Sequence, residues 1–126
     1  MKKKGRRAMK YMKTDSTDPC YNLAFEEYVL QNCKDDDYVL LWQNDNTIVF
    51  GVNQNPLEEI NMDAAKELGV NIVRRTTGGG AVYHDMGNLN FSYITDWDDG
   101  ESSSYARFLE PITKEFIQFN KEYREL

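Results

Sequence analysis

Hydrophobic and polar residues follow two different periods along the first half of the chain, and together they predict one helix and two strands. Asp18-Pro19 is typical of an N-cap followed by a first-turn proline, and the helix is expected to continue to about Cys33. The apolar runs 38–42 and 47–50 are rich in strand-forming residues, and a segment with turn chemistry, residues 44–46, separates them. The first half therefore predicts a helix followed by a pair of strands.

The second half adds a helix and three more strands. A helix over residues 62–68 is expected to end with Gly69 as its C-cap, and a strand over residues 70–73 then leads into two arginines. Residues 81–84 form a further expected strand. In residues 89–93, apolar and polar side chains alternate, which indicates a strand with one buried face.

Apolar residues near the end of the chain recur at spacings of three and four, which predicts an amphipathic helix. They are Tyr105, Phe108, Leu109, Ile112, Phe116, Phe119 and Tyr123. Pro111 leaves the start of this helix open. The order α-β-β-α-β-β-β-α indicates an α/β (α+β) fold with a mixed, mostly antiparallel sheet flanked by helices.

Charge is unevenly distributed over the 126 residues, a length that suits one domain at most. Six of the 15 Lys and Arg residues lie within the first ten residues, so the rest of the chain is strongly acidic. An acidic body argues against broad nucleic-acid binding, which requires neutralised phosphates. We interpret residues 1–8 as a basic leader or start-site artefact, expected to be disordered, rather than a functional arm, and assign residues 9–126 to the domain.

Cysteine, histidine and hydropathy restrict the class of protein further. Two cysteines are too few for a disulfide scaffold and favour a reducing cytoplasm. One histidine and no CxxC pair argue against a metal site. No apolar run is long enough to span a bilayer, and no apolar segment follows the basic start as in a secretory signal, so no membrane role is expected.

The segment that carries chemistry is Arg74–Asp85, RRTTGGGAVYHD. Gly78, Gly79 and Gly80 allow positive φ, and the amides of such a loop can form a nest for anionic oxygens. Arg74 and Arg75 supply positive charge and bidentate donors for phosphate or carboxylate. The spacing is neither a Walker A motif nor a dinucleotide fingerprint. Two interpretations stay open, an anion-binding loop, which is favoured, and a glycine-rich hairpin with two exposed arginines.

Together with the residues around it, this segment matches the signature of one family. The stretch from Arg74 to Ile94, RRTTGGGAVYHDMGNLNFSYI, strongly resembles the signature of the lipoate–protein ligases. The resemblance extends upstream through DPCYNLAFEE, LWQN and QNP, and covers nearly everything from Met9 to Tyr123. The glycine-rich block is highly specific to the lipoate and biotin ligase superfamily, so the resemblance implies a biotin/lipoate protein ligase-like catalytic fold, here in truncated form.

The resemblance implies an adenylate-forming ligase. Such enzymes activate lipoate with ATP and Mg²⁺ to lipoyl-adenylate and then transfer the lipoyl group to a lysine of an acceptor domain. The acceptors implied are the E2 subunits of 2-oxoacid dehydrogenases and the glycine-cleavage H protein. A carboxylate is already ionised at neutral pH, so its attack on the α-phosphate requires positioning and charge cancellation rather than a general base.

The same resemblance implies roles for individual residues. Arg75 would contact the nucleotide phosphate, and the backbone of Gly80, Ala81, Val82 and Tyr83 would line the ATP and adenylate site. The residues expected to shape the loop and the lipoyl pocket are Arg74, Thr77, Gly78, Gly79, His84 and Asn88.

Several residues keep a structural and a functional interpretation. His84 is a candidate catalytic group, but a structural residue that fixes the loop is favoured. Asp85 is equally compatible with turn capping and with deprotonating the acceptor amine. Adjacent Glu26 and Glu27 resemble paired catalytic carboxylates, yet neighbouring helix residues point about 100° apart, so a solvated or salt-bridging role is favoured. Four aromatic residues are expected in the core, one or two of them walling a lipoyl tunnel: Trp42, Phe50, Tyr83 and Phe91.

The sequence departs from the family in two places. Val52 stands where the family commonly carries a basic residue. By the same resemblance, the family's essential lysine lies in strands that follow in other members, and Lys114 and Lys121, on the expected last helix, do not match it. We therefore expect the N-terminal part of a ligase that self-associates or pairs with a complementary chain. Three functions stay open: a ligase or ligase part, a non-catalytic remnant or subunit, and an ATP-independent lipoyl or octanoyl transferase.

Overall fold

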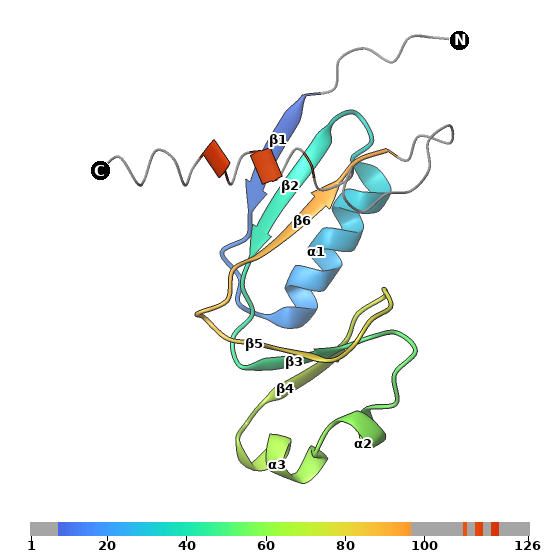
Figure 1. Cartoon of the computed structure of the whole chain (residues 1–126), viewed down its shortest axis with the longest axis vertical. Helices are drawn as coiled ribbons and strands as arrows, with labels where there is room; N and C mark the ends of the chain where they lie inside the picture. The colour runs from blue at the N-terminus through green and yellow to red at the C-terminus, as the bar shows by residue number, and fades with distance from the viewer. Residues whose placement is uncertain (1–7, 97–109, 111–112, 115–116, 119–126) are drawn as a thin grey trace. The chain divides into compact units, whose positions relative to one another are not determined.

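The computed structural model describes residues 8–96, 110, 113–114 and 117–118, and it contains two compact units (Figure 1). The first unit is Met1–Asp96 and the second is Trp97–Leu126. The described residues of the second unit are helical, and Lys114 pairs with Glu110 at 2.9 Å. The seven apolar residues of the expected amphipathic helix all lie outside the described residues.

The first unit contains most of the expected elements. In chain order they are β1 (Met9–Lys13), α1 (Pro19–Asn32), β2 (Asp37–Trp42), β3 (Thr47–Phe50), α2 (Pro56–Glu59), α3 (Met62–Glu67), β4 (Asn71–Arg74), β5 (Val82–His84) and β6 (Asn90–Ile94). The mixed α+β class is therefore confirmed.

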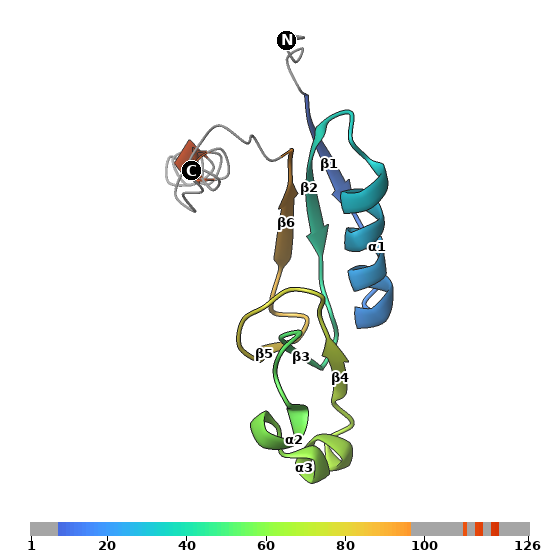
Figure 2. The same cartoon turned by 90° about the vertical axis from the view of Figure 1, so that its right-hand side faces the viewer.

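The strands are divided between two three-stranded sheets rather than joined in the single sheet that was expected (Figures 1 and 2). In the first sheet, β2 pairs in parallel with β1 and antiparallel with β6. In the second sheet, β3 pairs in parallel with β4 and antiparallel with β5. The chain passes from one sheet to the other between β2 and β3, and again between β5 and β6, so residues of both loops can couple the two sheets.

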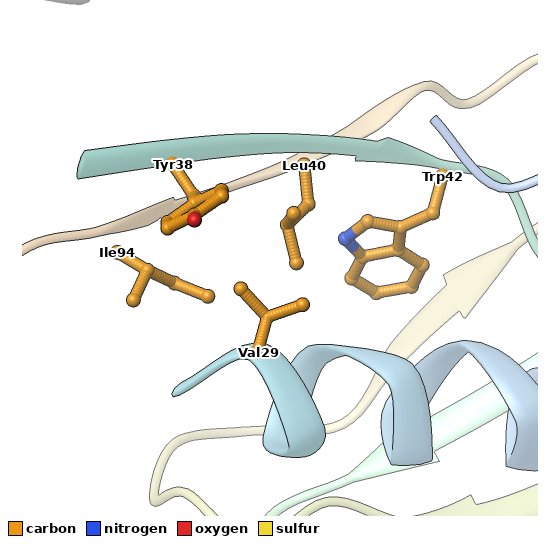
Figure 3. Close-up of a cluster of buried hydrophobic side chains, with 5 residues drawn as sticks. All are labelled: Val29, Tyr38, Leu40, Trp42 and Ile94. Atoms are coloured by element: carbon orange, nitrogen blue, oxygen red, sulfur yellow. The ribbon is translucent and has the colours of Figure 1, made fainter. Parts of the chain in front are cut away.

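Helix α1 covers one face of the first sheet (Figure 2). Val29 reaches from the helix toward Leu40 of β2, which is fully buried (Figure 3). Tyr38 and Trp42 lie on either side of Leu40 on the same face of the strand, and Ile94 of β6 completes the cluster (Figure 3). Burying side chains of this size stabilises the fold by about 1.5–3 kcal/mol each.

A smaller cluster supports the second sheet. Phe50, Ile60 and Ala65 are buried together, and Ile48 and Ile72 pack against them from β3 and β4. This cluster anchors β3 and β4, the two strands that lead into the turn after residue 50 and into the glycine-rich segment.

The predicted start of α1 and the predicted end of α3 are confirmed. Asp18 caps α1, with its carboxylate accepting from the amide of Cys20 at 2.8 Å. Gly69 follows α3 with φ of +64°.

Two elements were not predicted. Strand β1 begins directly after the basic segment, and α2 is a single turn that Asn55 caps and Pro56 begins.

Candidate anion-binding site

The glycine-rich loop, residues 76–81, joins β4 to β5 at one end of the second sheet. Its glycines are exposed, and Gly79 adopts φ of +116°, a conformation that side chains rarely accept. Arg75 stands where β4 ends, and its amide donates to the carbonyl of Phe50 at 3.0 Å. The loop therefore starts from a fixed point on the sheet.

Arg75 binds the carbonyl groups of the loop that follows it. Its Nη2 donates to the carbonyls of Gly80 at 2.8 Å and Gly78 at 3.1 Å, and Nε also donates to Gly78 at 3.3 Å. Nη1 lies 3.4 Å from the carbonyl of Val49 on β3. The guanidinium group thus holds the loop against the sheet, as its planar set of donors permits.

These bonds set the direction of the loop amides. In a trans peptide the carbonyl and the following N–H point in opposite directions. Because the carbonyls of Gly78 and Gly80 face Arg75, the amides of Gly79 and Ala81 face away from it. Within the described part of the chain, no acceptor is recorded for these two amides. A loop with free amides beside a guanidinium group can accept anionic oxygens.

Arg74, the other candidate cation, lies on the opposite side of the strand. Its Nη1 donates to the carbonyls of Val52 at 2.8 Å and Gln54 at 2.9 Å. Its guanidinium carbon also lies 4.4 Å from the centre of the Phe50 ring, a cation–π contact. Arg74 therefore contacts the turn after β3, whereas Arg75 contacts the glycine-rich loop.

His84 is a buried residue with defined partners. Only 8% of it is exposed, and its ring meets Trp42 edge-on with 5.8 Å between centroids. Nδ1 of His84 lies 3.2 Å from the side-chain amide nitrogen of Asn44, which is itself fully buried. Burial, with a smaller contribution from the charge of Arg75, lowers the pKa of His84 below its ordinary value.

Asp85 and Asn88 form the turn between β5 and β6. The carboxylate of Asp85 accepts from the amide of Gly87 at 2.8 Å, and its carbonyl accepts from the amide of Asn88 at 3.1 Å. The side chain of Asn88 donates to the side-chain oxygen of Asn90 at 3.0 Å. These contacts support the turn-capping interpretation of Asp85.

The core prediction is confirmed for Trp42 and Phe50 and is wrong for Tyr83 and Phe91. Tyr83 is 54% exposed, and its hydroxyl donates to the side chain of Asn46 at 2.9 Å. Phe91 is 41% exposed. Along β6, Ser92 and Ile94 contact α1, so by the alternation of a strand Phe91 lies on the other face of that sheet.

The favoured solvated or salt-bridging role of Glu26 is wrong, because this residue contacts the first sheet. The hydroxyl of Ser92 donates to the Glu26 carboxylate and accepts from Nε1 of Trp42 at 2.9 Å. Glu27 is exposed and accepts from Gln31, one helical turn further on.

Sequence reasoning missed Asn22, Asn44 and Ser92 as members of buried or half-buried networks. Asn22 and Asn44 bond each other beside His84, and Ser92 joins Trp42 to Glu26; each set of partners lies far apart in the sequence, so no local signal indicated these contacts.

Within residues 8–96 and the few described residues beyond them, no group of three or more His, Cys, Asp or Glu side chains is arranged to hold a metal ion. No described helix has the length and apolar character needed to cross a membrane.

The fold and the loop together define a mixed α+β domain with a glycine-rich loop suited to an anion. Residues 18–125 match the model of the lipoyl protein ligase A/B catalytic domain. The chain therefore belongs to this family.

Named relatives show how much of such proteins the chain represents. It is 46% identical over 108 residues to lipoate–protein ligase 1 of Staphylococcus aureus, a match that covers 84% of this chain and 33% of that protein. It is 47% identical over 107 residues to lipoate-protein ligase LplJ of Bacillus subtilis, covering 83% of this chain and 32% of that protein. The chain thus spans about a third of the length of these curated relatives.

Solved structures agree with this assignment. Plasmodium falciparum LipL1 in complex with lipoate superposes with a TM-score of 0.70 at 32% identity, covering 73% of this chain and 32% of that chain. A lipoate-protein ligase A bound with ATP gives a TM-score of 0.70 at 31% identity, covering 82% of this chain and 42% of that chain. A bipartite ligase from Thermoplasma acidophilum, described with its E2 lipoyl domain, gives 0.71 at 30% identity, covering 76% and 39%.

Proposed function

We propose that this chain is the part of a lipoate–protein ligase that binds ATP and lipoate and supports formation of lipoyl-adenylate. The observation that carries the proposal is the loop held by Arg75, with the amides of Gly79 and Ala81 directed away from the guanidinium group. Relatives bound to lipoate and to ATP support the choice of ligands.

The proposed reaction joins two anions. The lipoate carboxylate attacks the α-phosphorus of ATP, a new oxygen–phosphorus bond forms, and the bond to the β-phosphate breaks to release pyrophosphate. Like charges must approach in this step, so fixed positive charge and oriented amides are the contribution expected of the protein. Arg75 and the loop amides of Gly79 and Ala81 can supply that contribution.

Mg²⁺ is proposed to arrive on the phosphates of ATP, and no residue of this chain is assigned to it. In the second proposed step, a lysine amine of an acceptor domain attacks the lipoyl carbonyl and AMP leaves. The acceptors proposed are the lipoyl domains of E2 subunits and the glycine-cleavage H protein. Support for the first class comes from the archaeal ligase described with its E2 lipoyl domain.

The reducing cytoplasm is the proposed location of this chain, which agrees with two free cysteines, Cys20 and Cys33.

A complementary chain is a second candidate requirement, favoured by one observation. One structural neighbour is a bipartite ligase. In this case the chain would supply the loop, and a partner chain or a second copy would supply the rest of the site.

The test is a thermal-shift titration of this chain with Mg-ATP, lipoate and a non-hydrolysable lipoyl-adenylate analogue. A ligand that binds only the folded state raises the apparent unfolding temperature. A saturable rise with the adenylate analogue supports the proposal. Folded protein that shows no rise with any of the three contradicts ligand binding by this chain alone. Turnover with an acyl-carrier substrate and no ATP would instead favour the transferase.

A further inference from the structure

The turn that follows β3, residues Gly51 to Gln54, packs against the glycine-rich loop. The amide of Val52 donates to the carbonyl of Thr77 at 3.0 Å. A Cβ atom placed on Gly51 would lie only 2.2 Å from the carbonyl oxygen of Gly79. A glycine is therefore required at position 51, because the backbone of the loop occupies the space of any side chain.

The turn is held in one shape by its own residues. The amide of Gly51 donates to the side-chain oxygen of Gln54 at 2.9 Å, and the amide of Gln54 donates to the carbonyl of Gly51 at 3.1 Å. Gly51 is buried and Gln54 is half-buried. These reciprocal bonds pair backbone groups of the turn itself.

Arg74 fixes the turn to β4. Its Nη1 bonds the carbonyls of Val52 and Gln54, and the guanidinium group lies over Phe50, the last residue of β3. Since the next residue, Arg75, binds the loop itself, two successive arginines at the end of β4 hold the two backbone segments that contact each other.

We propose that the turn Gly51–Gln54, the buttress turn, is a positioning element that sets the shape of the glycine-rich loop. Gly51 and Gln54 are its positioning residues. The buttress turn fixes Gly79 and Thr77 from one side while Arg75 fixes Gly78 and Gly80 from the other. The consequence for affinity toward a nucleoside triphosphate rests on the proposed function, whereas the consequence for loop shape does not.

The experiment compares four variants of this chain by two readouts. The first readout is the chemical shifts and hydrogen-exchange rates of the Gly78, Gly79 and Gly80 amides, and the second is Mg-ATP affinity by calorimetry. Gly51→Ala places a methyl group against Gly79. Gln54→Met keeps the side-chain length but removes the oxygen that accepts from Gly51, and Gln54→Glu retains an acceptor oxygen. Val52→Ala is the matched control, because Val52 is exposed and contacts the loop and Arg74 through its backbone.

Gly51→Ala and Gln54→Met are expected to shift the three loop amides, speed their exchange and weaken Mg-ATP binding roughly tenfold or more. Gln54→Glu is expected to keep the wild-type loop amides, and Val52→Ala to keep both the amides and the affinity within about twofold. Should Gly51→Ala not fold, Gln54→Met decides the question, since it introduces no overlap.

Unchanged loop amides in Gln54→Met, or equal changes in Val52→Ala, would overturn the proposal. Wild-type protein that binds no Mg-ATP would contradict the proposed function instead, and the amide readout would still decide whether the buttress turn shapes the loop.

Discussion

The side-chain amide nitrogen of Asn44 lies 3.2 Å from Nδ1 of His84, and a second buried amide determines which proton is shared. Nδ2 of Asn22 donates to the side-chain oxygen of Asn44 at 3.0 Å, so the NH₂ group of Asn44 faces the imidazole. In this network Asn44 donates, and Nδ1 of His84 accepts. The neutral ring then carries its proton on Nε2, and Nδ1 is not free to act as a base.

The first prediction concerns the pH dependence of stability. The pKa of His84 is lowered in the folded chain relative to its ordinary value of 6.5, chiefly by burial and secondly by Arg75. The unfolded chain therefore binds this proton more readily than the folded chain does. The free energy of unfolding is therefore expected to keep its full value above about pH 6.5. It is expected to fall as the pH drops from there through the folded-state pKa of His84.

Urea unfolding at a series of pH values from about 7.5 to 5.5 measures this effect. His84 is the single histidine, so His84→Gln removes the only imidazole and is expected to flatten the curve in this range. A His84→Gln variant with the same pH dependence as wild type would contradict the assignment.

A second prediction follows from the direction of the Asn44 amide. Asn44→Asp replaces the donor facing Nδ1 with a carboxylate, which only a protonated Nδ1 can satisfy. The pKa of His84 is therefore expected to rise above its wild-type value rather than stay lowered. An NMR titration of the imidazole protons measures this pKa directly. If Asn44→Asp leaves it unchanged, the recorded contact does not exist in solution.

The third prediction separates buried from exposed asparagines. Asn44→Leu leaves Nδ1 of His84 without its donor in a buried site, and a loss of about 1–3 kcal/mol in the free energy of unfolding is expected. Asn32→Leu is the control, because Asn32 is exposed and its side chain bonds the carbonyl of Tyr28, one turn earlier in α1. Its effect is expected to stay within about 0.5 kcal/mol. Equal losses in the two variants would indicate that burial of the amide does not matter.

The sequence predicted those features whose cause is local. Asp18 begins α1 because its carboxylate caps the first amides, and Gly69 follows α3 because its φ is positive, and both signals lie within a few residues of the end they mark. The glycine-rich loop was found for the same reason. Strand β1 was missed because its sequence carries no alternating apolar pattern. It is held by backbone pairing with β2, and Met12 packs against the cluster of Val29, Leu40 and Trp42.

The contacts around the site could not be predicted from local sequence patterns, because they join residues that are far apart in the chain. Asn22 and Asn44 are 22 residues apart, and Asn44 and His84 are 40 apart. Their meeting depends on how α1 packs on one sheet and how β5 pairs with β3 in the other. Phe91 was misassigned because alternation identifies two faces of a strand without showing which face a helix covers.

The fourth prediction uses two adjacent glutamates as a matched pair. Glu26 accepts from Ser92, whose oxygen also receives the indole N–H of Trp42, whereas Glu27 is exposed. Glu26→Ala is expected to lower the free energy of unfolding by about 1–2 kcal/mol, and Glu27→Ala by less than about 0.5 kcal/mol. Urea denaturation measures both. A larger loss from Glu27→Ala would show that the helix presents a different face to the sheet.

The last prediction concerns Arg75 as both an organiser of the loop and a source of charge. Arg75→Lys keeps the positive charge, but an ammonium group cannot span the carbonyls of Val49, Gly78 and Gly80 that the guanidinium bonds together. Mg-ATP affinity, measured by calorimetry, is therefore expected to fall roughly tenfold or more even though the net charge is unchanged.

Lys66→Gln is the control for charge alone, because Lys66 is exposed on α3 and its loss makes the chain more acidic by one unit. Its affinity is expected to stay within about twofold of wild type. If Arg75→Lys binds Mg-ATP as tightly as wild type, positive charge at this position is sufficient and the bonds to the loop carbonyls do not contribute. If Lys66→Gln weakens binding as much as Arg75→Lys does, the nucleotide responds to the overall charge of the chain and not to the geometry that Arg75 imposes on the loop.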